Sequence, residues 1–314
     1  MATELNTLIT DLEQNIAQVV LGKPHAIRMC LVALLAGEHV LLEDVPGVGK
    51  TLMAKALSKS IDGSFTRIQF TPYLLPSDIV GSNILNSKNS EFTFSKGPIF
   101  SNVVLADEIN RTPPRTQSAL LEAMSDHQAT IDGVSHRLPD PFIVIATQNP
   151  FEFEGTYPLP ESQLDRFLIR ISMGYPDRSE ERRVLESHRG DHEPVESTTP
   201  AISCEQILDL QKSVRAVRVD EAINDYLLDL VHATRECDEL HVGVSTRGAL
   251  SLYRATQAYA ILCGRDFVIP DDIKTLAAPV LSHRVIAKGY LHTGHREAIE
   301  QLIDRLLNEI SVPE

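Results

Sequence analysis

The chain has 314 residues, of which 43% are hydrophobic and 23% are charged, and its formal net charge at pH 7 is −14. This composition excludes a disordered or fibrous protein, and the length is sufficient for two domains that each bury a core. The negative net charge repels a phosphate backbone, and no cluster of Lys and Arg offsets it, so we expect no nucleic-acid partner.

The chain begins with a segment that predicts an amphipathic helix ending at Gly22. Its apolar residues recur at intervals of three and four residues: Leu5, Leu8, Ile9, Leu12, Ile16, Val19 and Val20. Glu4 and Asp11 interrupt the continuous apolar stretch that a signal peptide requires, and the first basic residue is Lys23. No apolar run in the chain approaches the roughly 18–20 residues of a membrane-spanning helix. We therefore expect a cytoplasmic protein with no membrane span.

Five short apolar runs follow, and their length and β-branched content are typical of strands buried on both faces. They are His39–Glu43, Phe65–Phe70, Asn102–Ala106, Phe142–Ala146 and Phe167–Ser172. The segments between these runs are long enough for the crossover helices that parallel strands need. The pattern predicts an α/β fold in which a mostly parallel sheet lies between layers of helices.

Two insertions interrupt this alternation, and we expect both to project from the sheet layer. Ser82–Phe94 has a polar centre between apolar residues. Ala129–Leu138 contains Asp132-Gly133, which is a strong short-range signal for a hairpin.

The sequence then changes character in a polar, acidic segment with prolines, which we interpret as a linker at residues 189–202. It separates an α/β domain at residues 1–188, with the N-terminal helix and both insertions, from a smaller all-α domain at residues 203–314. Ser203 and Gln206 form the pattern of a capping box that opens the first helix of the second domain. The spacing of apolar residues further on predicts three or four more helices.

The strongest functional signal is Asp44-Val-Pro-Gly-Val-Gly-Lys-Thr51, which lies between a predicted strand and a predicted helix. Glycines let backbone N–H groups approach phosphates closely, and a helix N-terminus adds about half a positive charge. The segment therefore predicts a binding site for the phosphates of ATP. The residues expected to bind the nucleotide are Pro46, Gly47, Val48, Gly49, Lys50, Thr51 and Leu52.

Two side chains of this loop have predicted roles of their own. Lys50 is expected to neutralise the β- and γ-phosphates, and the Thr51 hydroxyl is expected to be a ligand of Mg²⁺. Asp44 replaces the first glycine of the general pattern. Because that position sets the turn and does not touch the γ-phosphate, we expect nucleotide binding to survive the replacement. The ordinary alternative is a glycine turn that arose by chance.

A second signal is the pair Asp107 and Glu108, which follows the apolar run Val103–Ala106. Open parallel sheets bind ligands at the carboxyl ends of their strands. We expect Asp107 to hold Mg²⁺ through a water molecule, and Glu108 to act as the general base that polarises the attacking water. Such a pair alone is more often the start of a solvated loop, but the phosphate loop upstream favours the catalytic interpretation.

Four further stretches give the chain a resemblance to a known family. They are GPIF at Gly97–Phe100, ADEINRTPPRTQSALLEAM at Ala106–Met124, ATQNP at Ala146–Pro150 and LPESQLDRF at Leu159–Phe167. Together with the phosphate loop, they resemble the MoxR branch of the AAA+ ATPases over nearly the whole chain. The resemblance implies a P-loop AAA+ core, with a five-stranded parallel sheet, helices on both faces and two inserted hairpins, followed by a smaller α-helical lid domain.

The same resemblance implies roles for three more residues. Asn149 matches sensor 1, which orients the attacking water, and Arg166 matches the arginine finger that one subunit supplies to its neighbour's ATP. Arg247, at the start of a predicted lid helix, matches sensor 2, which contacts the nucleotide from the lid. Each has an ordinary alternative: a turn residue at a strand end, a surface pair between Asp165 and Arg166, and a helix arginine that faces solvent.

These features, with the resemblance, predict an ATPase that uses ATP and Mg²⁺ and assembles as a homo-oligomeric ring, expected to be a hexamer. The reason for assembly is that each site is incomplete until a neighbour supplies Arg166. The resemblance implies chaperone-like remodelling of a client protein, and MoxR proteins commonly work with partners that contain a von Willebrand factor A domain. Two other classes stay open: a small-molecule P-loop kinase, and a nucleotide-gated scaffold with little hydrolysis. The net charge disfavours a DNA motor.

Overall fold

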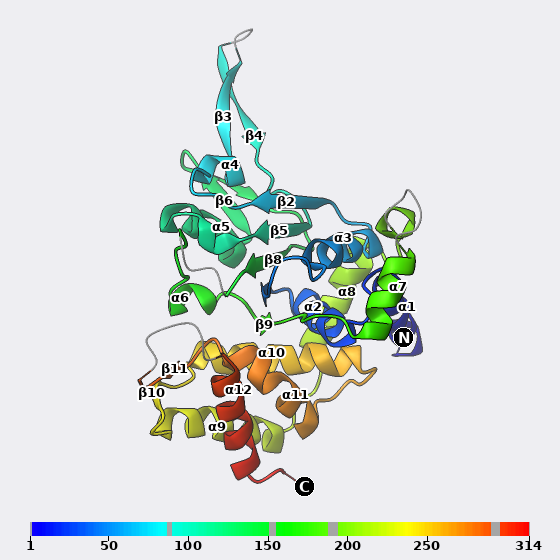
Figure 1. Cartoon of the computed structure of the whole chain (residues 1–314), viewed down its shortest axis with the longest axis vertical. Coiled ribbons are helices and arrows are strands. Elements are labelled where there is room, and N and C mark those ends of the chain that lie inside the picture. The colour runs from blue at the N-terminus through cyan, green and yellow to red at the C-terminus, as the bar shows by residue number, and fades with distance from the viewer. Residues whose placement is uncertain (1, 87–89, 151–154, 188–193, 290–295, 314) are drawn as a thin grey trace.

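The chain forms a sheet-centred part and a helical part that pack against each other (Figure 1). The computed structural model describes residues 2–86, 90–150, 155–187, 194–289 and 296–313. Residues 87–89 of the first predicted insertion and residues 188–193, which include the start of the predicted linker, lie outside these ranges.

Five parallel strands form the central sheet in the order β2-β5-β8-β1-β9. They are β1 (Val40–Glu43), β2 (Phe65–Gln69), β5 (Val103–Asp107), β8 (Ile143–Gln148) and β9 (Ile169–Ile171). The register pairs Glu43 with Gln148 and Gln69 with Asp107. Because these strands run in the same direction and end level with one another, the residues that follow β1, β5 and β8 meet at one edge of the sheet.

Helices cover both faces of this sheet. Those packed on its two faces are α1 (Ala2–Val19), α2 (Pro24–Ala36), α3 (Lys50–Ser60), α4 (Pro76–Val80) and α5 (Pro114–Asp126). Two further helices of this part, α6 (Glu161–Leu164) and α7 (Arg178–Ser187), have no buried residue. Successive side chains of a strand point to opposite faces. Val40 and Leu42 accordingly enter a hydrophobic cluster with α1, α2 and α3, whereas Leu41 enters a second cluster with α4 and α5. The predicted layers are therefore present.

Strand β2 differs from the prediction, because only Ile68 of its five residues is buried. The apolar run suggested a strand buried on both faces, but the strand order places β2 at the edge of the sheet, where β5 is its one neighbour within the sheet. Arg67 and Gln69 are exposed on this edge strand. Strand order depends on contacts distant in sequence, which a local pattern of residues does not contain.

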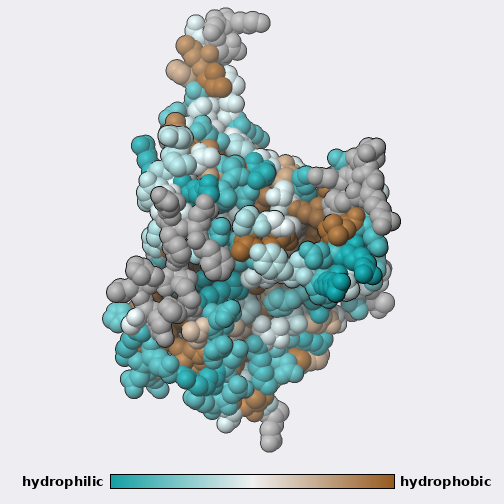
Figure 2. Space-filling view, viewed as in Figure 1, coloured by the Kyte–Doolittle hydropathy of each residue, from teal (hydrophilic) through white to brown (hydrophobic). Residues whose placement is uncertain are grey.

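Two antiparallel hairpins occupy the segments that were expected to project. Their strands are β3 (Gly81–Asn86), β4 (Glu91–Lys96), β6 (Gln128–Ile131) and β7 (Val134–Arg137). The β3–β4 hairpin extends far beyond the sheet (Figure 1). Hydrophobic surface gathers near its end (Figure 2), where Ile84, Leu85 and Phe92 are exposed.

The C-terminal part consists mainly of helices: α8 (Cys204–Arg215), α9 (Glu221–Glu236), α10 (Thr246–Leu262), α11 (Pro270–Leu281) and α12 (Arg296–Glu309). The capping box is present, because the Ser203 side chain accepts a hydrogen bond from the backbone N–H of Gln206. A short antiparallel pair, β10 (Leu240–Val242) and β11 (Ile286–Ala287), was not predicted. Strands of two and three residues are too short for alternation to show in the sequence.

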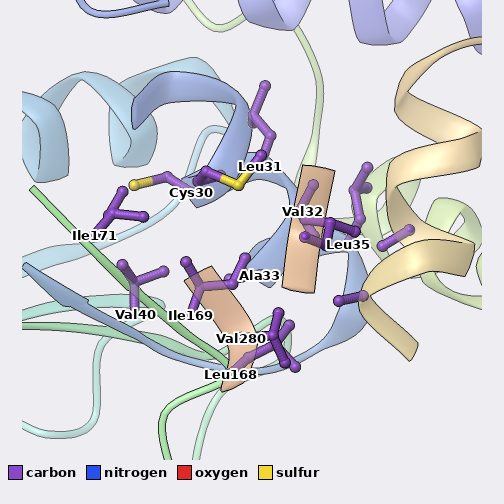
Figure 3. Packing of buried hydrophobic residues seen from close by; sticks show 14 of the residues in the cluster. Cys30, Leu31, Val32, Ala33, Leu35, Val40, Leu168, Ile169, Ile171 and Val280 are labelled. Carbon is purple, nitrogen blue, oxygen red and sulfur yellow. The ribbon is translucent and has the colours of Figure 1, made fainter. Parts of the chain in front are cut away.

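One hydrophobic cluster joins the sheet to the C-terminal helices, where the sequence predicted a separate core for each domain. Figure 3 shows Val32 of α2 in this cluster with Val40 and Ile169 of the strands and Val280 of α11. Helix α2 is apolar on nearly all sides, as expected for a helix buried between layers. Even so, no helix in the described ranges is long and apolar enough to cross a membrane.

Candidate nucleotide-binding site

A cavity of about 450 Å³ lies at the edge of the sheet where β1, β5 and β8 end. The predicted site residues that line it are Pro46, Gly47, Gly49, Lys50, Thr51, Leu52, Asp107, Glu108 and Asn149. Val48 turns away into the hydrophobic core, where it is buried. Three segments that are far apart in the sequence therefore share one space, as a site for a single triphosphate requires.

The backbone of the loop between β1 and α3 suits a phosphate site. Gly47 and Gly49 have φ angles of +87° and +97°, in the left-handed region that residues with a side chain rarely adopt. Helix α3 begins at Lys50, directly after Gly49. The first N–H groups of a helix have no partner within it, so this end of α3 offers several donors and a partial positive charge to an anion.

Lys50 lies close to all three acidic side chains of the site. Its ammonium group donates a hydrogen bond to the backbone oxygen of Asp44 at 2.8 Å. Burial lowers the pKa of Lys50, and the negative charges of Asp107, Asp44 and Glu108 act in the opposite direction. The charge of the Lys50 ammonium group therefore interacts with the charges of all three carboxylates.

Asp44, which replaces the usual glycine, fastens the start of the loop to the segment after β9. Its side-chain Oδ2 accepts hydrogen bonds from the Ser172 hydroxyl and the Gly174 N–H, both at 3.0 Å, and from the Met173 N–H. The side chain is buried. Hydrogen bonds from several donors to a buried carboxylate stabilise it strongly.

Asp44→Ala is expected to lower the free energy of unfolding by about 2–4 kcal/mol, because three donors, of which the Met173 N–H is buried, lose a buried charged acceptor. The shift of the urea midpoint measures this effect. Asp209→Ala, which removes an exposed carboxylate on α8, is the control and should change the stability by no more than about 0.5 kcal/mol. Equal stability of Asp44→Ala and wild type would contradict the anchoring role.

The carboxylate of Asp107 is held from two neighbouring strands. Its Oδ1 accepts a hydrogen bond from the Thr147 hydroxyl of β8 at 2.6 Å. Its Oδ2 lies 2.6 Å from Nη2 of Arg67 on β2. These contacts fix the carboxylate at the end of β5, beside the phosphate loop.

Glu108 follows directly and has a φ angle of +58°, which is uncommon for a residue with a side chain. Its backbone N–H donates to the Thr147 hydroxyl oxygen at 2.9 Å. Its carboxylate Oε2 accepts a hydrogen bond from Gln69 at 2.7 Å and lies 3.3 Å from Nε of Arg111. The general-base candidate is therefore oriented by side chains of three segments.

A second cavity, of about 710 Å³, is rich in arginine. The arginines that line it are Arg166, Arg215, Arg247 and Arg254. His39 also lines it, and burial lowers the pKa of His39 to about 4, so this ring is neutral at pH 7 and the positive charge comes from the arginines. The structure thus places two of the predicted site residues, Arg166 and Arg247, here rather than with Lys50.

Arg247 is connected to Arg166 through Asp165, which precedes Arg166 in the chain and pairs with Arg247. Arg166 donates to the backbone oxygen of Leu121 in α5 at 2.9 Å. Nε of Arg247 lies 3.4 Å from one Asp165 oxygen, and Nε of the buried Arg284 lies 2.8 Å from the other. Two arginines of the helical part therefore form ion pairs with the residue that precedes Arg166.

Comparisons with known proteins agree with this geometry. A model of the ATPase family associated with various cellular activities (AAA) matches residues 39–169, and a model of the AAA lid domain matches residues 232–306. The chain is 50% identical to the uncharacterized protein YeaC of Bacillus subtilis (strain 168), over 99% of this chain and 96% of the relative. It is 38% identical to chaperone MoxR1 of Mycobacterium tuberculosis, over 100% of this chain and 84% of the relative. The chain belongs to the MoxR family of AAA+ ATPases.

A solved structure supports the MoxR-family fold directly. It comes from Cytophaga hutchinsonii and is described as an inferred ATPase; it is 38% identical, has a TM-score of 0.90, and the match covers 100% of this chain and 97% of that chain. The predicted architecture, a P-loop AAA+ core with a five-stranded parallel sheet and a helical lid, is confirmed. Family membership supports ATP hydrolysis as the activity of this class of protein.

Three residues of the MoxR-type cavity were missed by the sequence analysis: Lys55, Arg67 and Gln69. Arg67 and Gln69 are two positions apart in a predicted strand, so alternation places both on the same face. Lys55 lies four residues after Thr51, on the same face of α3. These spacings were the available signals, but they indicate a site only once strand order is known.

The oxygen donors of the cavity fit Mg²⁺. Thr51 and Asp107 both line it, and hydroxyl and carboxylate oxygens are ligands that this ion accepts. Within the described parts of the chain, no group of three or more His, Cys, Asp or Glu side chains is arranged to hold a metal ion. Mg²⁺ usually keeps several waters and takes one or two protein ligands together with phosphates, so a larger group is not required.

Proposed function

We propose that this MoxR-family protein is a Mg²⁺-dependent ATPase that assembles into a hexameric ring and uses ATP hydrolysis to remodel a client protein. One observation carries the proposal: Lys50, Thr51, Asp107 and Glu108 line a single cavity at the carboxyl edge of a parallel sheet. A triphosphate bound there has a cation, a helix N-terminus and a candidate base around it.

The residues of the cavity divide the work of hydrolysis. Lys50 and the N-terminus of α3 bind the phosphates. Thr51 and Asp107 hold Mg²⁺, which, when bound, neutralises charge on the phosphate oxygens. Glu108 accepts a proton from the attacking water, and Asn149 orients that water.

Ring assembly supplies the arginines of the site. Arg166 and Arg247 line the second cavity, so in this arrangement of the chain a nucleotide bound by Lys50 would meet them only on another copy. We assign Arg166 as the finger for the neighbour's nucleotide and Arg247 as a second cationic contact to it. For Arg247, this keeps the expected contact to the nucleotide from the lid and assigns it to the nucleotide of the neighbour.

The client role is supported by a name among the relatives, since one of them is called chaperone MoxR1. A partner with a von Willebrand factor A domain is a proposal that rests on the family resemblance. The division into a core at residues 1–188, a linker at residues 189–202 and a lid at residues 203–314 is likewise proposed, and a cytoplasmic location stays a prediction.

Lys50→Ala is expected to weaken nucleotide binding at least about 100-fold, because it removes the charge that faces the phosphates. Calorimetric titration with ADP and Mg²⁺ measures this change. Lys59→Ala alters the same charge at an exposed position of the same helix and should bind like wild type. Unchanged affinity in Lys50→Ala would place the nucleotide elsewhere.

Release of phosphate into water, rather than transfer to a metabolite, separates an ATPase from a kinase.

A further inference from the structure

Strand β2 places a cation directly on the carboxylate that is proposed to hold Mg²⁺. Nη2 of Arg67 lies 2.6 Å from Oδ2 of Asp107, and Nε of Arg67 donates to the same oxygen at 3.1 Å. The other oxygen, Oδ1, accepts from the Thr147 hydroxyl at 2.6 Å. Donors of the chain itself therefore engage both oxygens of Asp107.

The Arg67 side chain is exposed enough to move away from Asp107. Its side chain is 48% exposed, whereas the side chain of Asp107 is 13% exposed. Its guanidinium also donates to the side-chain oxygen of Gln69 at 2.8 Å, and both residues lie on the edge strand of the sheet. Because the arginine of this pair is half-exposed, water can replace its contact with Asp107, so breaking the pair costs less than breaking a buried one.

The carboxylates at the end of β5 explain why a cation lies there. Asp107 and Glu108 are adjacent, and both face the cavity, where their negative charges repel each other. The guanidinium offsets this repulsion at Oδ2 of Asp107. A Mg²⁺ ion held through a water molecule at the same oxygen brings twice the charge, so the hydrated ion and Arg67 compete for one position.

We propose that Arg67 occupies the cation position on Asp107 before nucleotide binds, and that Mg²⁺ arriving with the nucleotide displaces it. Arg67 is then a positioning residue that sets how much Mg²⁺ the site requires. The inference rests on the proposed function, because it takes Asp107 as a metal-holding carboxylate. The displaced guanidinium stays in the same cavity, where the nucleotide phosphates are its next anionic partner.

The experiment follows the binding of a fluorescent ADP analogue, mant-ADP, as Mg²⁺ is raised, so no turnover is needed. Arg67→Gln removes the competitor and is expected to lower the half-saturating Mg²⁺ concentration about two- to fivefold, the range that an exposed ion pair supplies. Arg67→Lys keeps the charge without the planar fork and should lower it less. Arg218→Gln removes the same charge from a surface pair with Asp220 and should leave the concentration unchanged.

Asp107→Asn separates failure of this inference from failure of the proposed function. In the Asp107→Asn background, Arg67→Gln should have no further effect, because the carboxylate for which the two cations compete is gone. An unchanged or higher Mg²⁺ requirement in Arg67→Gln alone, or an equal shift in both backgrounds, overturns the inference while the metal site stands. If Asp107→Asn alone keeps the Mg²⁺ requirement of wild type, the proposed metal site fails and the inference fails with it.

Discussion

Arg166→Ala is expected to bind ATP as tightly as wild type and to hydrolyse it about 10³-fold more slowly, or slower still. Arg166 lines the second cavity, apart from the residues that surround a nucleotide in its own chain, so its truncation leaves binding intact. The rate falls because a planar, fixed charge no longer meets the charge that develops on the transferred phosphoryl group. Calorimetric binding and phosphate release, measured on one preparation, test both halves of this expectation.

Mixing two inactive variants tests whether Arg166 acts on a neighbour. A subunit with Arg166→Ala keeps a complete cavity, and a subunit with Glu108→Gln keeps its arginine, so a mixed ring contains sites with both groups. The mixture should therefore recover ATPase activity that neither variant has alone. Glu108→Gln mixed with the double variant Glu108→Gln/Arg166→Ala is the control and should stay inactive. No recovery in rings shown to be mixed would mean that Arg166 serves its own subunit.

Glu108→Gln is expected to keep nucleotide affinity and to lower the hydrolysis rate by about 10²–10⁴-fold, the usual contribution of a general base. The amide has nearly the shape of the carboxylate, but it cannot accept the proton of the attacking water. Single-turnover hydrolysis measures the chemical step. Glu122→Gln removes the same charge from an exposed position of α5 and should hydrolyse ATP at the wild-type rate.

The hydrolysis rate of Glu108→Gln relative to wild type also distinguishes an ATPase that remodels a client from a nucleotide-gated scaffold. A nucleotide-gated scaffold has little hydrolysis to lose, so equal, slow rates in wild type and Glu108→Gln would favour it. If the variant binds ATP without hydrolysing it, the ring stays in the ATP-bound state and is expected to retain a bound client. A pulldown with this ATP-bound ring, compared with the same ring in ADP, would then identify the client.

The elements that were predicted correctly are those whose own residues, without distant contacts, indicate their structure. Strands β1, β5 and β8 are short apolar runs with both faces buried, and the turn into α3 is marked by Gly47 and Gly49, whose backbone conformation excludes most other residues. The residues of this loop and of Asp107-Glu108 could therefore be placed at one sheet edge from the general rule for parallel sheets.

The parts that escaped prediction depend on contacts across long stretches of chain. Asp44 meets Ser172 across 128 positions, and its role as an anchor is invisible until β9 lies beside β1. Arg67 reaches Asp107 only because β2 pairs with β5, which no local pattern contains. Arg247 was matched to a nucleotide contact by motif, but its place beside Arg166 follows from how α10 packs.

The single cluster that joins the sheet to the C-terminal helices limits how these two parts of the chain can move apart. Helix α2 contributes buried residues to the strands on one side and packs against α10 on the other. Swinging the helical part open would expose that apolar layer to water, at a cost that grows with the area uncovered. In the proposed ring, each subunit is therefore expected to move as one rigid body, with the structural changes of an ATP cycle at the interfaces between subunits rather than at a hinge within one.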